Sequence, residues 1–260
     1  MLTWSLQFAG ALLFLSVGLV SMGVALRARS ASATHVAAWR VTGTVFTLHG
    51  LTFSVQNLWG LAAIRAGAES GTMRMYLLAA PVFNHGRTFL LLACCGLLFG
   101  LALRPRFVLP RLPALMGATL AFGFASGCLV GFTEGRLVAA VHYAAVARLD
   151  AVELVLLFGM LFIALLNDAM DRLNWGVLAV YAFSVALNVM WFAGLASIND
   201  PSVWSPKPSH ILMIRALLVS SMLAMAAWRY RMVLAGTRVD GLMGASRRPV
   251  ASHTGAGWFG

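Results

Sequence analysis

The stretch MYLLAAPVFNHGRTFLLLACCGLLFGLAL, from Met75 to Leu103, decides the fold class. It is long enough to cross about 30 Å of hydrocarbon as a helix, and it carries Asn84, His85 and Arg87 within the apolar run. Ionisable side chains inside a spanning helix are costly, and they generally face the interior of a helix bundle. The sequence therefore predicts a central membrane helix whose neighbours supply polar partners for these three residues.

The composition of the whole chain supports the same class. Of the 260 residues, 60% are apolar and 10% are charged, whereas soluble domains of this length carry about 25% charged residues. The net charge of +11 comes from Lys and Arg residues between and after the apolar runs, where anchoring on the cytoplasmic side of a membrane explains them. We expect a multi-pass protein of a cell membrane, with the bacterial inner membrane as its location, that contacts the lipid bilayer and binds no nucleic acid.

Seven apolar runs predict an all-α bundle of seven transmembrane helices, each near or above the length of about 20 residues that a span requires. The runs cover residues 2–26, 36–64, 75–103, 112–132, 149–166, 175–198 and 211–228. Lys and Arg are concentrated in the first, third and fifth loops and in the tail. Because such residues are enriched on the cytoplasmic side, we expect the amino terminus outside and the carboxyl terminus in the cytoplasm. Residues 1–228 form the predicted membrane domain, and residues 229–260 form a basic, Gly- and Ser-rich tail that we expect to be flexible.

The fourth run is distinguished by small residues, with the core sequence GATLAFGFASGCLVG. Small residues let helix backbones approach closely in a membrane, so we expect a tightly packed helix with little chemistry of its own. The charged stretch that follows, from Glu134 to Arg148, is expected to form a short surface helix or an extension of the next span.

Polar residues in the other runs are expected to meet those of the third run. A rise of 1.5 Å per residue puts both His49 and His85 about 18 Å from the cytoplasmic surface, and the remaining buried polar groups fall in the outer half of the bundle. This distribution predicts a polar pocket that opens outward. The candidate ligand-binding residues are His49, Asn57, Asn84, His85, Arg87, Glu153 and Asn188.

These residues have chemical and purely structural interpretations. Arg87 is expected to pair with Glu153 or to hold an anionic group, and His49 and His85 are candidate ligand donors or pH-sensitive contacts. The two histidines are also the candidate ligands for a metal ion, a haem or a (bacterio)chlorophyll. In the structural interpretation, Asp150 and Glu153 complement the positive end of a helix, and the histidines are buried core residues.

Catalytic motifs are absent from the sequence. It has no His-Glu-x-x-His pair, no Gly-x-Ser-x-Gly elbow and no phosphate-binding loop. We therefore predict no catalytic residues and favour a protein that is not an enzyme.

Two similar stretches suggest an internal repeat. FSVQNLWGLAAI (Phe53 to Ile64) and FSVALNVMWFAGLASI (Phe183 to Ile198) each offer an Asn, then a Trp, and then Gly-Leu-Ala. They predict two parallel three-helix units joined by the fourth helix. This layout resembles that of the seven-helix sugar transporters of the SWEET type, which implies transport of a small solute. The prolines in the helices of that family are absent here, and the alignment of the two stretches requires gaps.

The sequence therefore favours a membrane protein that holds a small ligand or solute in an outward-facing polar site, for transport or for sensing. The alternative is an accessory subunit of a larger respiratory or photosynthetic complex, in contact with other membrane subunits and with histidines that ligate haem or pigment. A homo-oligomer is compatible with either interpretation. An intramembrane enzyme is the third interpretation.

Overall fold

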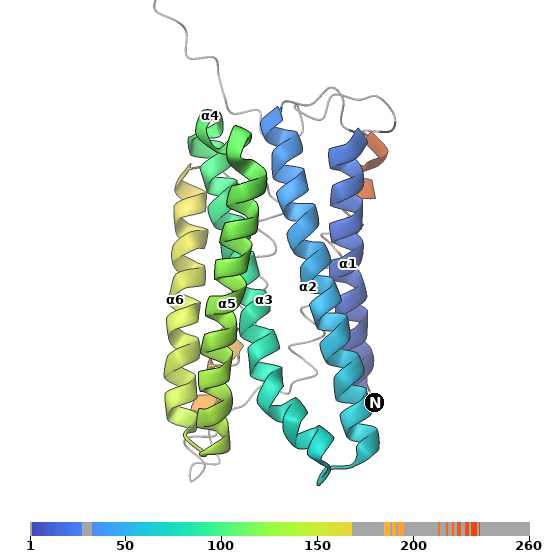
Figure 1. The fold of residues 1–260 in the computed structure, drawn as a ribbon, viewed down its shortest axis with the longest axis vertical. Helices are drawn as coiled ribbons and strands as arrows, with labels where there is room; N and C mark the ends of the chain where they lie inside the picture. The colour runs from blue at the N-terminus through green and yellow to red at the C-terminus, as the bar shows by residue number, and fades with distance from the viewer. Residues whose placement is uncertain are drawn as a thin grey trace, which may run out of the picture.

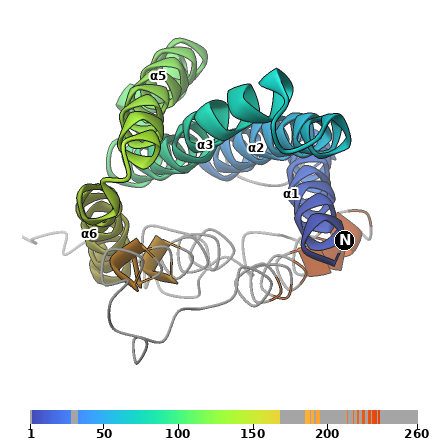
Figure 2. The same cartoon turned by 90° about the horizontal axis from the view of Figure 1, so that it is seen from below.

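The computed structural model describes residues 2–27 and 33–167, together with scattered residues between 185 and 234. This part of the chain is helical and contains no strand. Its helices are α1 (Leu2–Arg27), α2 (Ala33–Ala66), α3 (Gly71–Leu103), the short α4 (Pro105–Val108), a 3-10 turn (Leu109–Arg111), α5 (Leu112–Ala139) and α6 (Tyr143–Asn167). The long helices run side by side (Figure 1), and from one end they form an arc in the order α1, α2, α3, α5, α6 (Figure 2).

The described helices support an integral membrane protein. Three segments are long and apolar enough to cross a membrane, namely Gln7–Arg27, Gly71–Leu103 and Pro105–Ala139. Large apolar side chains such as Phe122 and Leu129 are more than two-thirds exposed, as contact with lipid requires. The sixth and seventh predicted runs, residues 175–198 and 211–228, and the tail fall largely outside the described residues, so the count of seven helices and the orientation stay predictions.

Helix α5 extends beyond the end expected from the fourth apolar run. It continues to Ala139, and α6 begins at Tyr143 after a short turn. The charged stretch that follows the fourth run is therefore divided between two long helices and forms no separate surface helix. As a result, Glu134 lies inside α5, and Asp150 lies two turns into α6.

Glycines set the distance between α3 and α5. Gly123, Gly127, Gly131 and Gly135 recur every four residues and therefore share one face of α5. A Cβ atom on Gly127 or Gly131 would lie closer than 3.0 Å to backbone atoms of α3, a distance that real Cβ atoms essentially never show. The two helices thus pack backbone against backbone, as the small residues of the fourth run predict.

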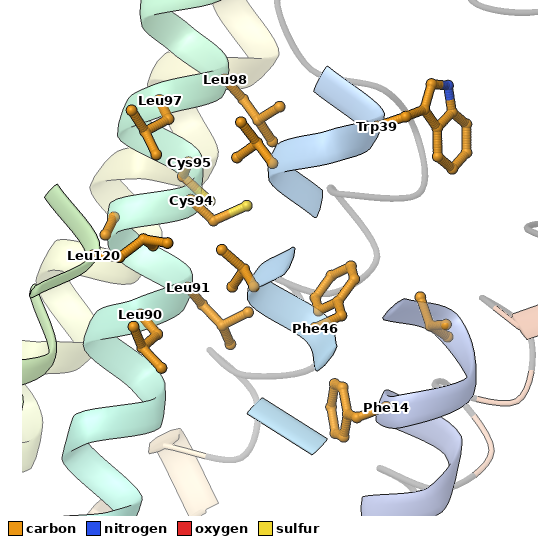
Figure 3. Close-up of a cluster of buried hydrophobic side chains, with 14 of the residues drawn as sticks. Phe14, Trp39, Phe46, Leu90, Leu91, Cys94, Cys95, Leu97, Leu98 and Leu120 are labelled. Carbon is orange, nitrogen blue, oxygen red and sulfur yellow. The ribbon is translucent and has the colours of Figure 1, made fainter. Parts of the chain in front are cut away.

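The same kind of contact joins α1 to α2. A Cβ atom on Gly18 or Gly50 would collide with the backbone of the facing helix, at Thr47 and Leu15 respectively. Between these helices and α3 lies an apolar cluster that includes Phe14 of α1 and Phe46 of α2 (Figure 3). The packed core therefore runs along α1, α2 and α3, with α5 and α6 on the other side of α3 (Figure 2).

The glycine stripe of α5 can be tested by a matched pair of substitutions. Gly131→Ala places a methyl group against the backbone of Pro81 and Val82, so we expect it to destabilise the protein by about 1–3 kcal/mol. Gly117→Ala lies in the same helix with no atom within 4 Å of the new Cβ, and we expect it to be neutral or stabilising by up to about 1 kcal/mol. Thermal unfolding of the two detergent-solubilised variants measures the difference. Equal effects would contradict the packing.

The arrangement of the turns predicts which residues are reached from the same side of a membrane. The α2–α3 and α5–α6 turns lie at one end of the bundle, and α4 lies at the other (Figure 1). In a background without native cysteines, we expect Glu69→Cys and His142→Cys to react with an impermeant maleimide from the same side. Phe107→Cys should react only from the opposite side. Labelling of Glu69→Cys and His142→Cys from opposite sides would overturn this arrangement.

Candidate functional site

His85 of α3 lies at the centre of a buried group of ionisable side chains. Its Nε2 atom contacts Oε2 of Glu134 from α5 and lies 3.8 Å from Oδ1 of Asp150 from α6. Its Nδ1 atom lies 2.5 Å from Oε2 of Glu153 from α6, at an ion-pair distance without the alignment of a hydrogen bond. Each of the four residues is at most 8% exposed. We call this group, His85, Glu134, Asp150 and Glu153, the His85 cluster.

The pattern of buried positions explains how α6 supplies two carboxylates. Val146, Asp150, Glu153 and Leu157 are buried, and their spacing of four, three and four residues places them on one face of a helix. That face packs towards α3 and α5. Asp150 and Glu153 therefore occupy positions where a core apolar residue would otherwise stand.

The glycine stripe explains how α5 supplies the third carboxylate. Glu134 follows Gly131 by three residues and precedes Gly135, so it lies on the face that packs against α3. A Cβ atom on Gly127 would meet the carbonyl group of His85 itself. The close approach that the glycines permit therefore also brings the Glu134 carboxylate to the imidazole.

The cluster lies towards the end of the bundle that carries the α5–α6 turn. Glu134 is five residues from the end of α5 and Asp150 is seven residues from the start of α6. At 1.5 Å per residue these positions are about 8–10 Å from the turn. In the orientation that the sequence predicts, this end faces outward.

A second polar group lies on the side of α3 that packs against α2. Nη1 of Arg87 donates a hydrogen bond to Oε1 of Gln56, and Nη2 donates one to Oδ1 of Asn84 at 2.6 Å. The guanidinium carbon lies 4.3 Å from the centroid of the Phe53 ring, within the range of a cation–π contact. Arg87 is 4% exposed, and these contacts place its guanidinium between α2 and α3.

The structure separates the predicted site residues into different groups. Glu153 is expected to pair with Arg87, but it contacts His85 instead. Arg87 donates hydrogen bonds to Gln56 and Asn84. Helical geometry accounts for the difference, because residues 85 and 87 point to nearly opposite sides of α3, about 160° apart.

His49 does not join His85. It is fully buried, and its ring centroid lies 4.4 Å from that of Phe14 in α1. The neighbouring Gly50 admits the backbone of α1 at Leu15 rather than a planar cofactor. The structure therefore does not bring the two histidines together as a haem with two axial histidines requires.

Of the two remaining asparagines in the predicted set, the structure describes Asn57 but not Asn188. Asn57 is 3% exposed, and its side-chain amide has no hydrogen-bond partner among the described residues. Asn188 lies outside the described residues, as does half of the stretch 183–198, the second half of the predicted repeat.

Sequence reasoning missed Glu134 and Asp150 as site residues. Asp150 was interpreted as a charge at a helix end, and Glu134 was assigned to a stretch between two spans. The signal that could have placed Glu134 is the four-residue spacing of the glycines. It continues to Gly135, so Glu134 lies next to the face of α5 that the glycines form. For Asp150, the signal is its i,i+3 spacing to Glu153 on the buried stripe of α6.

The His85 cluster contains more acidic than basic groups. A carboxylate buried away from water is stable only when a cation or a proton neutralises it. One imidazole carries at most one positive charge, so it cannot neutralise three carboxylates. Oε1 of Glu153 is also buried without a hydrogen-bond partner among the described residues. The arrangement is therefore suited to hold a positively charged ligand.

Comparisons with protein-family models, with curated proteins and with solved structures find no match to this chain.

The charge imbalance predicts opposite effects for two kinds of substitution in the presence of a chelator. His85→Asn leaves three buried carboxylates without their counterion, so we expect it to lower the free energy of unfolding by about 3–5 kcal/mol. Asp150→Asn removes one of the competing charges, so we expect no loss of stability or a gain. Thermal unfolding of both variants in EDTA measures the effects, with His142→Asn at an exposed position as the control. A gain in stability for His85→Asn would contradict the charge balance.

Proposed function

We propose that this protein is a multi-pass membrane protein that binds a small cationic solute at the His85 cluster and takes part in the transport of that solute. The observation that carries this proposal is the excess of buried carboxylates over basic groups around His85. Ionisable side chains within membrane helices characteristically mark ion and substrate pathways. A cation at this site would neutralise the excess negative charge.

The position of the cluster favours transport over a purely structural role. Its side chains come from three helices, α3, α5 and α6, and ionisable side chains that face the interior of a membrane bundle mark ion and substrate pathways. A structural ion pair requires only one carboxylate for one histidine. The two further carboxylates have no such role, and their charges destabilise the bundle unless a bound cation or protons offset them.

The accessory-subunit alternative has no comparable observation behind it. The exposed apolar side chains of α5 and α6, such as Phe122 and Val155, are what either lipid or a neighbouring subunit would contact. The contacts of His85 with carboxylates on both ring nitrogens also favour a cation over a haem or pigment, whose ligand is a single neutral nitrogen atom.

Thermal unfolding of the purified protein with a panel of cations tests the binding. We propose Na⁺, K⁺, Mg²⁺, Mn²⁺, Zn²⁺ and choline, each with the wild type and with the double variant Glu134→Gln/Asp150→Asn. A ligand at 100 times its Kd stabilises the folded state by about 2.7 kcal/mol. We expect at least one cation to stabilise the wild type in this way and to have a much smaller effect on the double variant.

Exposed residues provide the matched control. Glu69→Gln and His142→Asn make the same kinds of change outside the cluster, and we expect both variants to respond as the wild type does. If no cation stabilises the wild type more than the double variant, the site does not bind a cation. Uptake of the stabilising cation into proteoliposomes then tests transport, and binding without uptake would overturn the transport role.

A further inference from the structure

The geometry points to a divalent first-row transition-metal ion as the cation, bound directly by Nε2 of His85 and by carboxylate oxygens of Glu134 and Asp150. This assignment rests on the proposed function and names the class of its solute. It excludes monovalent, organic and alkaline-earth cations as the preferred ligand.

The three donor atoms lie at metal-binding separations. One donor atom from each of His85, Glu134 and Asp150 lies within 4.8 Å of the other two. Metal bonds of about 2.0–2.2 Å place neighbouring ligand atoms about 3–3.5 Å apart. Small movements of the side chains therefore suffice for all three to bind one ion. The ligands come from three different helices, so the packing of those helices fixes the size of the site.

Glu153 supports this assignment as a positioning residue. A histidine that ligates a metal through one nitrogen almost always directs its other nitrogen to a carboxylate or carbonyl group. Here Nδ1 of His85 lies 2.5 Å from Oε2 of Glu153, which places a carboxylate at this nitrogen although the contact lacks the alignment of a hydrogen bond. A proton on Nδ1 leaves the lone pair of Nε2 free and directed towards Glu134 and Asp150. This arrangement is independent of the count of acidic groups, and an ordinary acidic cluster lacks it.

A buried polar atom without a hydrogen-bond partner also supports a bound cation. Oε1 of Glu153 is buried and has no hydrogen-bond partner among the described residues, although the residue is only 4% exposed. An unsatisfied carboxylate oxygen at this depth is costly. A cation on Nε2 of His85 would attract this carboxylate across the imidazole ring and so lower the cost of burying its charge.

The types of ligand decide the class of metal. An imidazole together with carboxylates suits ions such as Mn²⁺, Fe²⁺ and Zn²⁺. Mg²⁺ and Ca²⁺ prefer sites made only of oxygen atoms, and Cu⁺ prefers the sulfur of Cys or Met. With a neutral imidazole the three carboxylates carry three negative charges, of which a divalent ion offsets two and a monovalent ion only one.

Isothermal titration calorimetry on the full chain, after removal of any affinity tag and treatment with EDTA, tests the assignment. The titrants are Zn²⁺, Mn²⁺, Mg²⁺ and Ca²⁺. We expect one Zn²⁺ or Mn²⁺ ion per chain, bound at least about 100-fold more tightly than Mg²⁺ or Ca²⁺. His85→Asn, Glu134→Gln and Asp150→Asn should each weaken Zn²⁺ binding by at least about 100-fold, since each removes a ligand.

Glu153 has a distinct expected signature. Glu153→Gln should weaken binding by about 10- to 100-fold and leave the visible absorption spectrum of bound Co²⁺ close to that of the wild type, because the ligands remain. Glu153→Asp should recover part of the affinity. A changed Co²⁺ spectrum in Glu153→Gln would show that Glu153 is itself a ligand and overturn its positioning role.

Each remaining outcome has a definite meaning. Glu69→Gln and His142→Asn should bind Zn²⁺ as the wild type does, and gel filtration shows whether each variant is folded. Zn²⁺ binding that survives in folded Glu134→Gln and Asp150→Asn would place the metal elsewhere and overturn the inference. If no transition metal binds, the inference fails, but stabilisation by Na⁺, K⁺ or choline that requires Glu134 and Asp150 would leave the proposed cation-binding function standing.

Discussion

The contact of His85 with carboxylates on both ring nitrogens is the interaction on which the proposed account depends. Such a group is expensive inside a membrane protein, because every charge in it has been removed from water. The bundle tolerates the group only if the charges neutralise one another, if carboxylates take up protons, or if a bound cation completes the balance. The imidazole faces three carboxylates, two of them from α6 and one from α5, so the charges do not balance by themselves. From this imbalance follow both the proposed cation binding and the metal assignment.

The backbone contact between α3 and α5 makes this arrangement possible. The four glycines of α5 remove the side chains that would keep the helices apart, and the carboxylate then lies against His85. Packing and chemistry therefore share one sequence pattern, since the glycines that stabilise the helix pair also define the distance across the site.

Much of the fold and part of the site could be predicted from the sequence. The apolar runs indicate membrane helices, and the ionisable residues within residues 75–103 predict a central helix with buried polar partners. The direction of each candidate side chain around its helix could not be predicted. His49 and His85 were expected at one level, but depth along a helix does not specify the direction of a side chain around it. His49 packs on Phe14 of α1, while His85 faces α5 and α6.

Two further differences have physical reasons. Opposite charges predict a pair between Arg87 and Glu153, but Glu153 contacts His85, and the contacts of Arg87 include Gln56, Asn84 and the Phe53 ring. The composition of the fourth run indicates a tightly packed helix but does not indicate which way Glu134 faces. A lone Glu after an apolar run is typical of a helix end, and only the register of the glycines indicates that it faces a neighbouring helix.

The most direct test of the account is anomalous X-ray diffraction from crystals of the protein grown with Mn²⁺ or Zn²⁺, recorded at the absorption edge of the metal. A metal ion at the His85 cluster would give one strong anomalous peak per chain between α3, α5 and α6. The peak would lie within about 2.0–2.2 Å of Nε2 of His85 and of oxygens of Glu134 and Asp150. A peak elsewhere on the chain, with no density at His85, would contradict the metal assignment. Side chains of Glu134 and Asp150 that point to lipid would contradict the charged cluster itself.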